Sequence, residues 1–184
     1  MTEIIFVTHS TSLDNERRLA SGHADTPLSP LGRRQAAALG GRYRDTCLAA
    51  IVCSDLQRSY CTAEIAFAHR NIPIIKDPRL RECDYGEFTR HSTDLVERER
   101  LHRVTVPFPG GESYAQAAAR VRSLLEDLMG RYSGQRIMLV GHRATQYALE
   151  HWLNGVPLEE VVVAPFQWQP GWAYRLVSLP ASSP

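Results

Sequence analysis

The stretch Ile4-Ile5-Phe6-Val7-Thr8-His9 joins a short β-rich apolar run to a histidine that directly follows it. The run predicts a buried strand over residues 4–8, and similar runs predict strands at residues 49–53, 72–75, 136–140 and 172–177. Helical patterns separate most of these runs, which is typical of βα units around a parallel sheet. We therefore expect a three-layer α/β/α sandwich with a mostly parallel central sheet.

Three capping signals predict where helices begin. Ser29-Pro30 places serine at an N-cap and proline at the first helical position. Ser54–Gln57 and Ser113–Gln116 have the spacing of capping boxes, in which glutamine follows serine three residues later. The three helices are expected to end near residues 43, 69 and 132. A fourth helix is expected over residues 144–153.

The length of 184 residues fits a single domain over residues 1–184, since domains run roughly 100–200 residues. The pattern weakens between Asp77 and Gly111, where it indicates only a short helix over residues 93–103 and a turn rich in proline and glycine. Long segments of this kind often lie over a binding site. We expect residues 77–111 to form an inserted lid or loop region.

The basic residues are 20 arginines and one lysine, Lys76, and the net charge is +1. No GxxxxGK[ST] phosphate loop is present, and the near-neutral charge argues against nucleic acid as a partner. The start has no signal-peptide pattern, and no apolar run approaches the ~18 residues of a membrane span. We expect a cytoplasmic protein with no membrane partner and with reduced cysteines. The sequence does not indicate the oligomeric state.

Three candidate functional residues follow predicted strands. Ligands in parallel sheets bind beyond the carboxyl ends of the strands, near the point where the strand order switches. His9 directly follows the first strand, Arg58 lies one turn into the helix after the second, and His142 lies two residues past the fourth. Each residue alone is more often structural than catalytic. Their shared placement at one edge of the sheet indicates an active site there.

Five segments, in order along the chain, together carry a family resemblance. They are Thr8-His9-Ser10 with Asn15, Ser21-Gly22 and residues 25–36; Ser54-Asp55-Leu56-Gln57-Arg58 with Thr62-Ala63; Leu80-Arg81-Glu82 with Tyr85-Gly86-Glu87; Pro109-Gly110-Gly111-Glu112-Ser113; and Val140-Gly141-His142. Taken together they resemble the histidine phosphatase superfamily, also called the phosphoglycerate mutase-like proteins. The resemblance spans residues 4 to about 150 and implies a phosphoglycerate mutase-like fold.

The resemblance implies a covalent mechanism that needs no metal and no other cofactor. His9 would attack the phosphorus of a phosphomonoester and form a phosphohistidine. Arg58 and His142 would bind the phosphoryl oxygens. Glu82 would protonate the leaving oxygen and then take a proton from the water that hydrolyses the intermediate. The substrate rim would be lined by Asn15, Ser21 and Gly22.

Several positions depart from the family's pattern. Members usually have arginine before the nucleophilic histidine and glycine after it, where this chain has Thr8 and Ser10. Arg143 stands where a glycine usually follows the second histidine, and Leu19, beside Arg18, replaces a further arginine. A dianionic phosphoryl group needs several donors. We hypothesise that Arg143 or Arg18 supplies the missing guanidinium next to Thr8; the alternative for Arg143 is a solvated residue that opens a helix.

Other conspicuous residues have structural interpretations. The remaining histidines lack the spacing of a metal site, and the motifs HExxH, GxSxG and GxGxxG are absent. Trp152, Trp168 and Trp172 are expected to pack the last strand and helix. Substrate stacking or a dimer contact is the less favoured alternative for these tryptophans.

The sequence therefore predicts a metal-independent phosphomonoesterase that acts through His9 on a small phosphorylated metabolite. A phosphatase is favoured over a mutase because the chain is short, whereas the mutases of the family usually carry extra segments that shield the phosphoenzyme from water. Two alternatives stay open. One is a phosphoglycerate mutase-type phosphotransferase, and the other is a catalytically weak or inactive domain that binds phosphorylated ligands, which Thr8 leaves possible in this chain.

Overall fold

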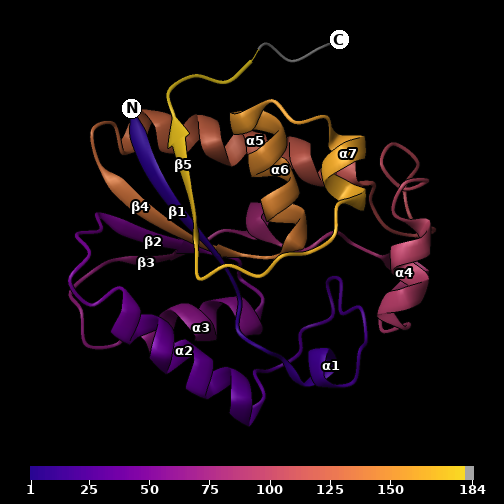
Figure 1. Cartoon of the computed structure of the whole chain (residues 1–184), viewed down its shortest axis with the longest axis horizontal. Coiled ribbons are helices and arrows are strands. Elements are labelled where there is room, and N and C mark those ends of the chain that lie inside the picture. Colours follow the sequence, from indigo (N-terminus) through magenta and orange to yellow (C-terminus); the bar gives the residue numbers. More distant parts are fainter. Residues whose placement is uncertain (181–184) are drawn as a thin grey trace.

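The computed structural model describes residues 1–180, which form a five-stranded sheet with helices on both faces (Figure 1). Two 3-10 turns, η1 (Pro78–Leu80) and η2 (Gly86–Phe88), lie in the segment that follows the third strand. The other elements are β1 (Thr2–Thr8), α1 (Leu13–Glu16), α2 (Pro30–Arg42), β2 (Ala50–Cys53), α3 (Gln57–Phe67), β3 (Ile74–Lys76), α4 (Thr93–Glu99), α5 (Tyr114–Arg131), β4 (Arg136–Gly141), α6 (Arg143–Asn154), α7 (Leu158–Val163) and β5 (Trp172–Leu176).

The strand order across the sheet is β3-β2-β4-β1-β5. The first four strands run parallel, and β5 pairs antiparallel with β1 at the edge. Helices α2 and α3 cover one face, while α5 and α6 cover the other (Figure 1). The structure confirms the predicted three-layer α/β/α sandwich with a mostly parallel sheet.

Strand residues alternate between two apolar cores. In β4, Ile137 and Leu139 belong to the core beneath α5 and α6, whereas Met138 and Val140 belong to the core beneath α2 and α3. All four side chains are fully buried, as expected for a parallel sheet that is covered on both faces. The sheet is therefore a rigid base for the residues that follow its strands.

β1 and β4 are adjacent strands, and the helices that follow them lie on opposite faces of the sheet. Helix α2 follows β1 on one face, and α6 follows β4 on the other. Thr8 pairs with Gly141, and the His9 N–H donates to the Gly141 carbonyl at 2.9 Å. This is the switch point at which ligands bind in such sheets. His9 and His142 therefore emerge side by side.

The N-terminus of α3 differs from the predicted capping box. The Ser54 hydroxyl accepts a hydrogen bond from the Leu56 N–H at 3.2 Å and closes a turn, so it does not cap residue 57. The helix begins at Gln57, whose N–H donates to Asp25 Oδ1 at 2.8 Å. The prediction was wrong because the capping acceptor comes from a distant loop, which local spacing does not reveal.

Other boundaries also differ from the expectations. The Ile72 N–H donates to the Arg70 carbonyl in a turn, so β3 begins only at Ile74. The expected helix over residues 93–103 ends at Glu99, and the short helices α1 and α7 were not predicted. In the part of the chain that the structure describes, no helix has both the length and the apolar character needed to cross a membrane.

Residues 77–111 lie beyond the strand ends, with α4 beside α1 (Figure 1). Backbone hydrogen bonds tie this segment to the loop after β1. The Ala20 N–H donates to the His91 carbonyl at 2.9 Å, and the Thr93 N–H donates to the Arg18 carbonyl at 2.9 Å. Gly86 packs closely inside the segment, since a Cβ atom there would lie 2.1 Å from the Pro109 carbonyl oxygen. The segment expected as a lid is thus anchored to the loop after β1 and packs closely within itself.

Candidate active site

Two adjoining cavities open at the carboxyl ends of β1 and β4. The inner pocket, of about 130 Å³, is lined by Arg58 and the Ser21-Gly22 loop. The outer cavity, of about 660 Å³, includes Thr8 and His142. Six residues line both spaces: His9, Asn15, Glu82, Glu97, Arg100 and Arg143.

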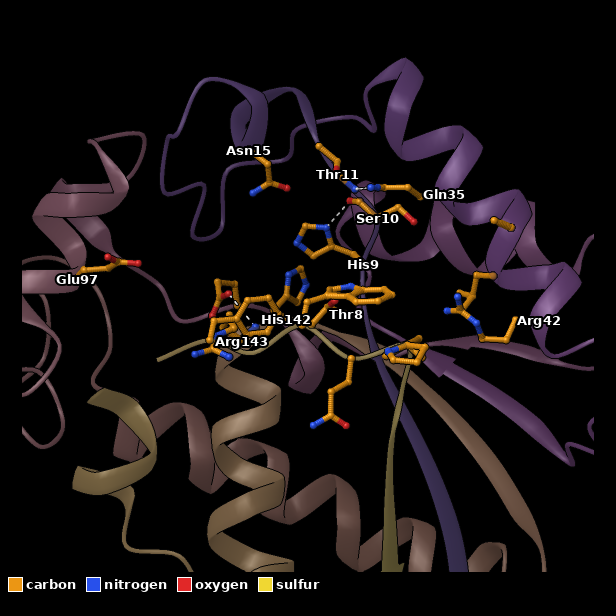
Figure 2. A pocket seen from close by; sticks show the side chains of 18 of the residues that line it. Thr8, His9, Ser10, Thr11, Asn15, Gln35, Arg42, Glu97, His142 and Arg143 are labelled. Atoms are coloured by element: carbon orange, nitrogen blue, oxygen red, sulfur yellow. Dashed lines mark hydrogen bonds between the residues drawn. The ribbon is translucent and has the colours of Figure 1, made fainter. Parts of the chain in front are cut away.

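His9 lies where the two cavities meet, and its Nδ1 is 2.7 Å from the Ser10 carbonyl oxygen (Figure 2). A carbonyl oxygen can only accept, so Nδ1 carries the proton of the neutral ring and Nε2 keeps a lone pair. Burial and the positive charge of Arg58 lower the pKa of His9 to about 3. At neutral pH the ring therefore presents an unprotonated nitrogen that can act as a nucleophile.

His142 faces His9, with ring centroids 4.9 Å apart and the rings tilted by 58° (Figure 2). Its side chain is buried, and no residue between 1 and 180 offers either ring nitrogen a hydrogen-bond partner. Burial and the charge of Arg58 hold the pKa of His142 well below its ordinary value. A buried polar group without a hydrogen bond costs roughly 1–3 kcal/mol of stability, so a ligand that hydrogen-bonds to the His142 ring would remove this cost.

Arg58 comes from the first turn of α3 and is only 1% exposed. Its Nη1 donates to the Ala24 carbonyl at 2.9 Å, and its Nη2 donates to the Gly22 carbonyl at 2.7 Å. These bonds fix both the guanidinium and the loop before α2. The remaining N–H groups of Arg58 are held at the inner pocket as donors for an anion.

Glu82 follows η1 and reaches the N-terminus of α6. Its Oε1 accepts from the backbone N–H groups of Cys83 at 2.8 Å and Ala144 at 3.0 Å, and its Oε2 accepts from Arg143 N at 3.2 Å. Three backbone donors therefore orient the carboxyl group between the cavities. Because Oε2 accepts a single bond, at 3.2 Å, from residues 1–180, it keeps lone-pair capacity for a ligand.

The residues predicted for the substrate rim also line the site. The Asn15 side-chain oxygen accepts from both the N–H and the hydroxyl of Ser12 at 2.9 Å, so its amide N–H groups are left to face a ligand. Gly22 has a φ of +50°, and a Cβ atom there would crowd Tyr85 and Thr89 at 3.1–3.3 Å. The left-handed backbone favours glycine, and the close approach leaves little room for a Cβ atom.

The two arginines hypothesised to replace the missing guanidinium lie in different places. Arg143 lines both cavities, and its Nη1 donates to Gln146 Oε1 at 2.9 Å. The Arg18 side chain is 79% exposed, pairs with Asp94 at 3.6 Å and lines neither cavity. Thr8 lines the outer cavity only. The structure thus brings Arg143, and not Arg18, to the site.

Arg100 and Glu97 were not predicted from the sequence, yet both line the two cavities. Arg100 follows α4, its Nη2 lies 3.3 Å from Glu97, and its Nε is buried without a hydrogen-bond partner among residues 1–180. The weak pattern of residues 77–111 indicated a segment over the site. It could not indicate which side chains of that segment turn inward.

The three tryptophans differ in environment. Trp172 packs in the core with its ring centroid 5.6 Å from that of Phe6, and Trp152 donates to the Ala118 carbonyl at 2.8 Å. Trp168 is 65% exposed and lines the outer cavity. The expectation that Trp168 packs the last strand is wrong, because the loop between α7 and β5 carries it to the mouth of the cavity.

The arrangement has a definite chemical character. Among residues 1–180, no three histidine, cysteine or acidic side chains gather in a way that could hold a metal ion. The groups that converge are a neutral histidine with one unprotonated nitrogen, a second histidine whose ring nitrogens find no partner among residues 1–180, several guanidinium groups and a carboxyl group. Such a set at the switch point of an α/β sheet has the chemistry suited to tetrahedral oxyanions such as phosphate esters.

Comparison with known proteins identifies the family. The family model of the histidine phosphatase superfamily (branch 1) matches residues 4–168, and the chain belongs to this superfamily. The "Probable phosphoglycerate mutase GpmB" of Enterobacter sp. (strain 638) is 33% identical over 165 residues, which cover 85% of this chain and 77% of that relative.

Two solved structures extend the comparison. YhfR of Bacillus stearothermophilus has a TM-score of 0.84 and 26% identity, over 94% of this chain and 90% of that one. A mycobacterial glucosyl-3-phosphoglycerate phosphatase, solved in complex with VO3, has a TM-score of 0.79 and 27% identity, over 89% and 87% of the two chains. The similar proteins thus include a phosphatase and a probable mutase.

Proposed function

We propose that this protein is a phosphomonoester hydrolase that acts through a phosphohistidine on His9. The observation that carries the proposal is the meeting of two histidines at one cavity. Nε2 of His9 is unprotonated, and within the described residues 1–180 neither ring nitrogen of His142 has a hydrogen-bond partner, beside the buried Arg58. The similarity to a solved phosphatase structure supports the same reaction class.

In the first step, Nε2 of His9 attacks the phosphorus and the P–O bond to the alcohol breaks. Glu82 donates a proton to the leaving oxygen through Oε2. In the second step, water attacks the phosphorus of the phosphohistidine and the N–P bond breaks. Glu82 takes back a proton from that water, and inorganic phosphate leaves.

The phosphoryl oxygens need several positive donors, because negative charge is spread over them in the transition state. Arg58 and His142 provide donors from two sides of His9. Arg143 and Arg100 line the same cavities and add two guanidinium groups. In this proposal they supply the charge that an arginine at position 8 would otherwise contribute.

A phosphoglycerate mutase activity is the second candidate, favoured by the name of the 33% identical relative. We prefer hydrolysis, because the mouth of the outer cavity is formed partly by exposed side chains, Phe166 and Trp168, and water can reach His9 there. The proposed substrate is a small phosphorylated metabolite.

The test compares the wild type with His9→Ala on p-nitrophenyl phosphate. We expect turnover in the wild type, none in His9→Ala, and wild-type turnover in His69→Ala, which changes an exposed histidine at the end of α3. Rapid quenching with ³²P-labelled substrate should trap an acid-labile, alkali-stable phosphoenzyme only where His9 is present.

Three results would contradict the proposed hydrolase mechanism. Equal turnover in His9→Ala would exclude His9 as the nucleophile. Absence of turnover together with measurable phosphate binding would favour a phospholigand-binding domain. Isomerisation of 3-phosphoglycerate to 2-phosphoglycerate faster than phosphate release would establish the mutase.

A further inference from the structure

The outer cavity is much larger than a phosphoryl group requires. Its volume of about 660 Å³ lies in the range of sites that enclose whole drug-sized ligands, whereas the inner pocket beside Arg58 has about 130 Å³. The extra space extends from His9 towards α2 and the loop of residues 164–171. Four side chains outline this part, which we term the ring subsite: Gln35, Arg42, Phe166 and Trp168.

Large aromatic surfaces are exposed in the ring subsite. Trp168 is 65% exposed and Phe166 46% exposed, although the Phe166 ring centroid lies 6.3 Å from that of the buried Trp172. Tryptophan combines a wide flat face with a polar N–H group and is frequent where ligands stack. A connecting loop that holds two such rings at the mouth of a catalytic cavity has the composition of a binding surface.

Guanidinium groups hold these rings in place. The Arg143 Cζ atom lies 4.2 Å from the centroid of Phe166 and 4.9 Å from that of Tyr147, so the guanidinium bridges the two rings. On the other side of the cavity, the Arg42 Cζ atom lies 5.9 Å from the centroid of Trp168. These cation–π contacts join the aromatic loop to the residues that line the catalytic cavity.

Polar groups surround the flat surfaces. Gln35 uses its side-chain oxygen to accept the Thr11 N–H at 2.9 Å, and its amide N–H groups are left for a ligand (Figure 2). Gln169 and the Arg42 guanidinium line the same space. A subsite with aromatic faces and amide or guanidinium edges suits a heteroaromatic ring, which stacks through its face and hydrogen bonds through its edge.

We propose that the ring subsite binds a flat heteroaromatic ring carried by the leaving alcohol of the substrate. The substrate class is then phosphomonoesters of heteroaromatic glycosides, of the kind represented by nucleoside 5′-monophosphates. This inference rests on the proposed function, since Glu82 lines both cavities and the leaving alcohol would depart past it into the outer cavity.

The test uses substrates that share the reacting phosphate and differ in the ring. Adenosine and cytidine 5′-monophosphates are compared with ribose 5-phosphate, which lacks a base. Because stacking tolerates any base, the wild type should have a kcat/KM about tenfold or more higher for both nucleotides than for ribose 5-phosphate. In Trp168→Ala this ratio should fall towards one, while Trp168→Phe should keep most of it. Val177→Ala, which changes an exposed apolar residue beyond β5, should keep the wild-type ratio.

The possible failures are distinguishable. If p-nitrophenyl phosphate is hydrolysed in a His9-dependent manner but the wild-type ratio is near one, or Trp168→Ala leaves the ratio unchanged, the ring subsite is wrong and the proposed function stands. If no phosphomonoester is hydrolysed, the proposed function fails. The subsite is then tested by calorimetric binding of the same three ligands. Tighter binding of the nucleotides than of ribose 5-phosphate that is lost in Trp168→Ala would support the subsite, and equal affinities in the wild type would overturn it.

Discussion

The protonation state of His9 is set by two neighbouring groups. The Ser10 carbonyl holds the proton on Nδ1, and the Arg58 guanidinium together with burial disfavours a second proton on the ring. A nucleophile with a pKa of about 3 is ready to react across the neutral range. The same guanidinium that favours the neutral ring also faces the inner pocket, where an anionic substrate would bind.

Thr8 offers a direct test of the charge balance around His9. In Thr8→Arg a guanidinium is added to the wall of the outer cavity, where charge-assisted hydrogen bonds are worth roughly 1.5–3 kcal/mol. Orthovanadate mimics the pentacoordinate transition state of phosphoryl transfer. We expect its inhibition constant to fall by about tenfold or more. The measurement is inhibition of p-nitrophenyl phosphate hydrolysis.

Thr8→Met is the control, since it adds comparable length without charge. Equal tightening by Thr8→Met and Thr8→Arg would mean that shape, not charge, limits anion binding. No tightening by Thr8→Arg would show that Arg100 and Arg143 already meet the need for positive donors.

Single residues were predictable where they directly follow strands. The positions of His9 and His142 could be predicted from the strand pattern, because the residues after neighbouring parallel strands lie at one edge of the sheet. Arg100 was not predictable in this way. It turns inward from an irregular segment whose position depends on tertiary hydrogen bonds, and those have no local signature in the sequence.

At the level of secondary-structure elements, the start of α3 depends on a partner outside the helix. Asp25→Ala removes the acceptor of the Gln57 N–H, and loss of an N-cap acceptor costs about 1 kcal/mol. Urea unfolding should show this loss of stability, and Asp25→Asn should recover most of it. The exposed Asp45→Ala should leave the free energy of unfolding unchanged. A cost no larger than that of Asp45→Ala would refute the cap.

The segment of residues 77–111 depends on glycine at one position. Gly86 has a φ of +50°, and a Cβ atom there would lie 2.1 Å from the Pro109 carbonyl oxygen. The left-handed backbone costs an alanine roughly 1–2 kcal/mol, and the overlap adds a similar amount, so Gly86→Ala should lose about 3 kcal/mol in urea unfolding.

Gly110 provides a matched comparison within the same segment. Its φ is +69°, and no atom of residues 1–180 outside its chain neighbours lies within 4 Å of its added Cβ atom. Gly110→Ala should therefore lose only the backbone contribution, roughly 1–2 kcal/mol. Similar losses in Gly86→Ala and Gly110→Ala would show that the close approach to Pro109 is relieved by movement of the chain.

Elements were predictable from the sequence where local rules determine them. Ser29 and Ser113 cap α2 and α5 as expected, because the acceptor and the donors lie within one turn. The position of β5 at the sheet edge, antiparallel to β1, depends on pairing between the two ends of the chain. Periodicity alone carries no information on such pairing.

For the whole molecule, the neutral ring of His9 makes stability depend on pH. Its pKa is about 3 in the folded protein and about 6.5 in the unfolded chain, so the unfolded chain binds more protons as the pH falls below 6.5. The contribution is fully present above pH 6.5 and decreases towards pH 3. By pH 5, His9 alone should have lost about 2 kcal/mol.

Urea unfolding at pH 7.5 and pH 5 in phosphate-free buffer measures this effect. The decrease in the free energy of unfolding should be about 2 kcal/mol smaller in His9→Gln than in the wild type. His69→Gln should behave as the wild type does, because its ring is exposed. The same decrease in His9→Gln and the wild type would mean that His9 is not held neutral in the folded protein.

The register between β1 and β4 has a consequence for how such a protein can change. The two histidines are attached to paired strands, whereas the rings at the cavity mouth come from the connecting loop of residues 164–171. In the proposed scheme, the reacting histidines and the aromatic part of the ring subsite therefore come from different segments of the chain. Exchange of the loop of residues 164–171, by evolution or by protein engineering, would change the substrate preference and leave the two histidines in place.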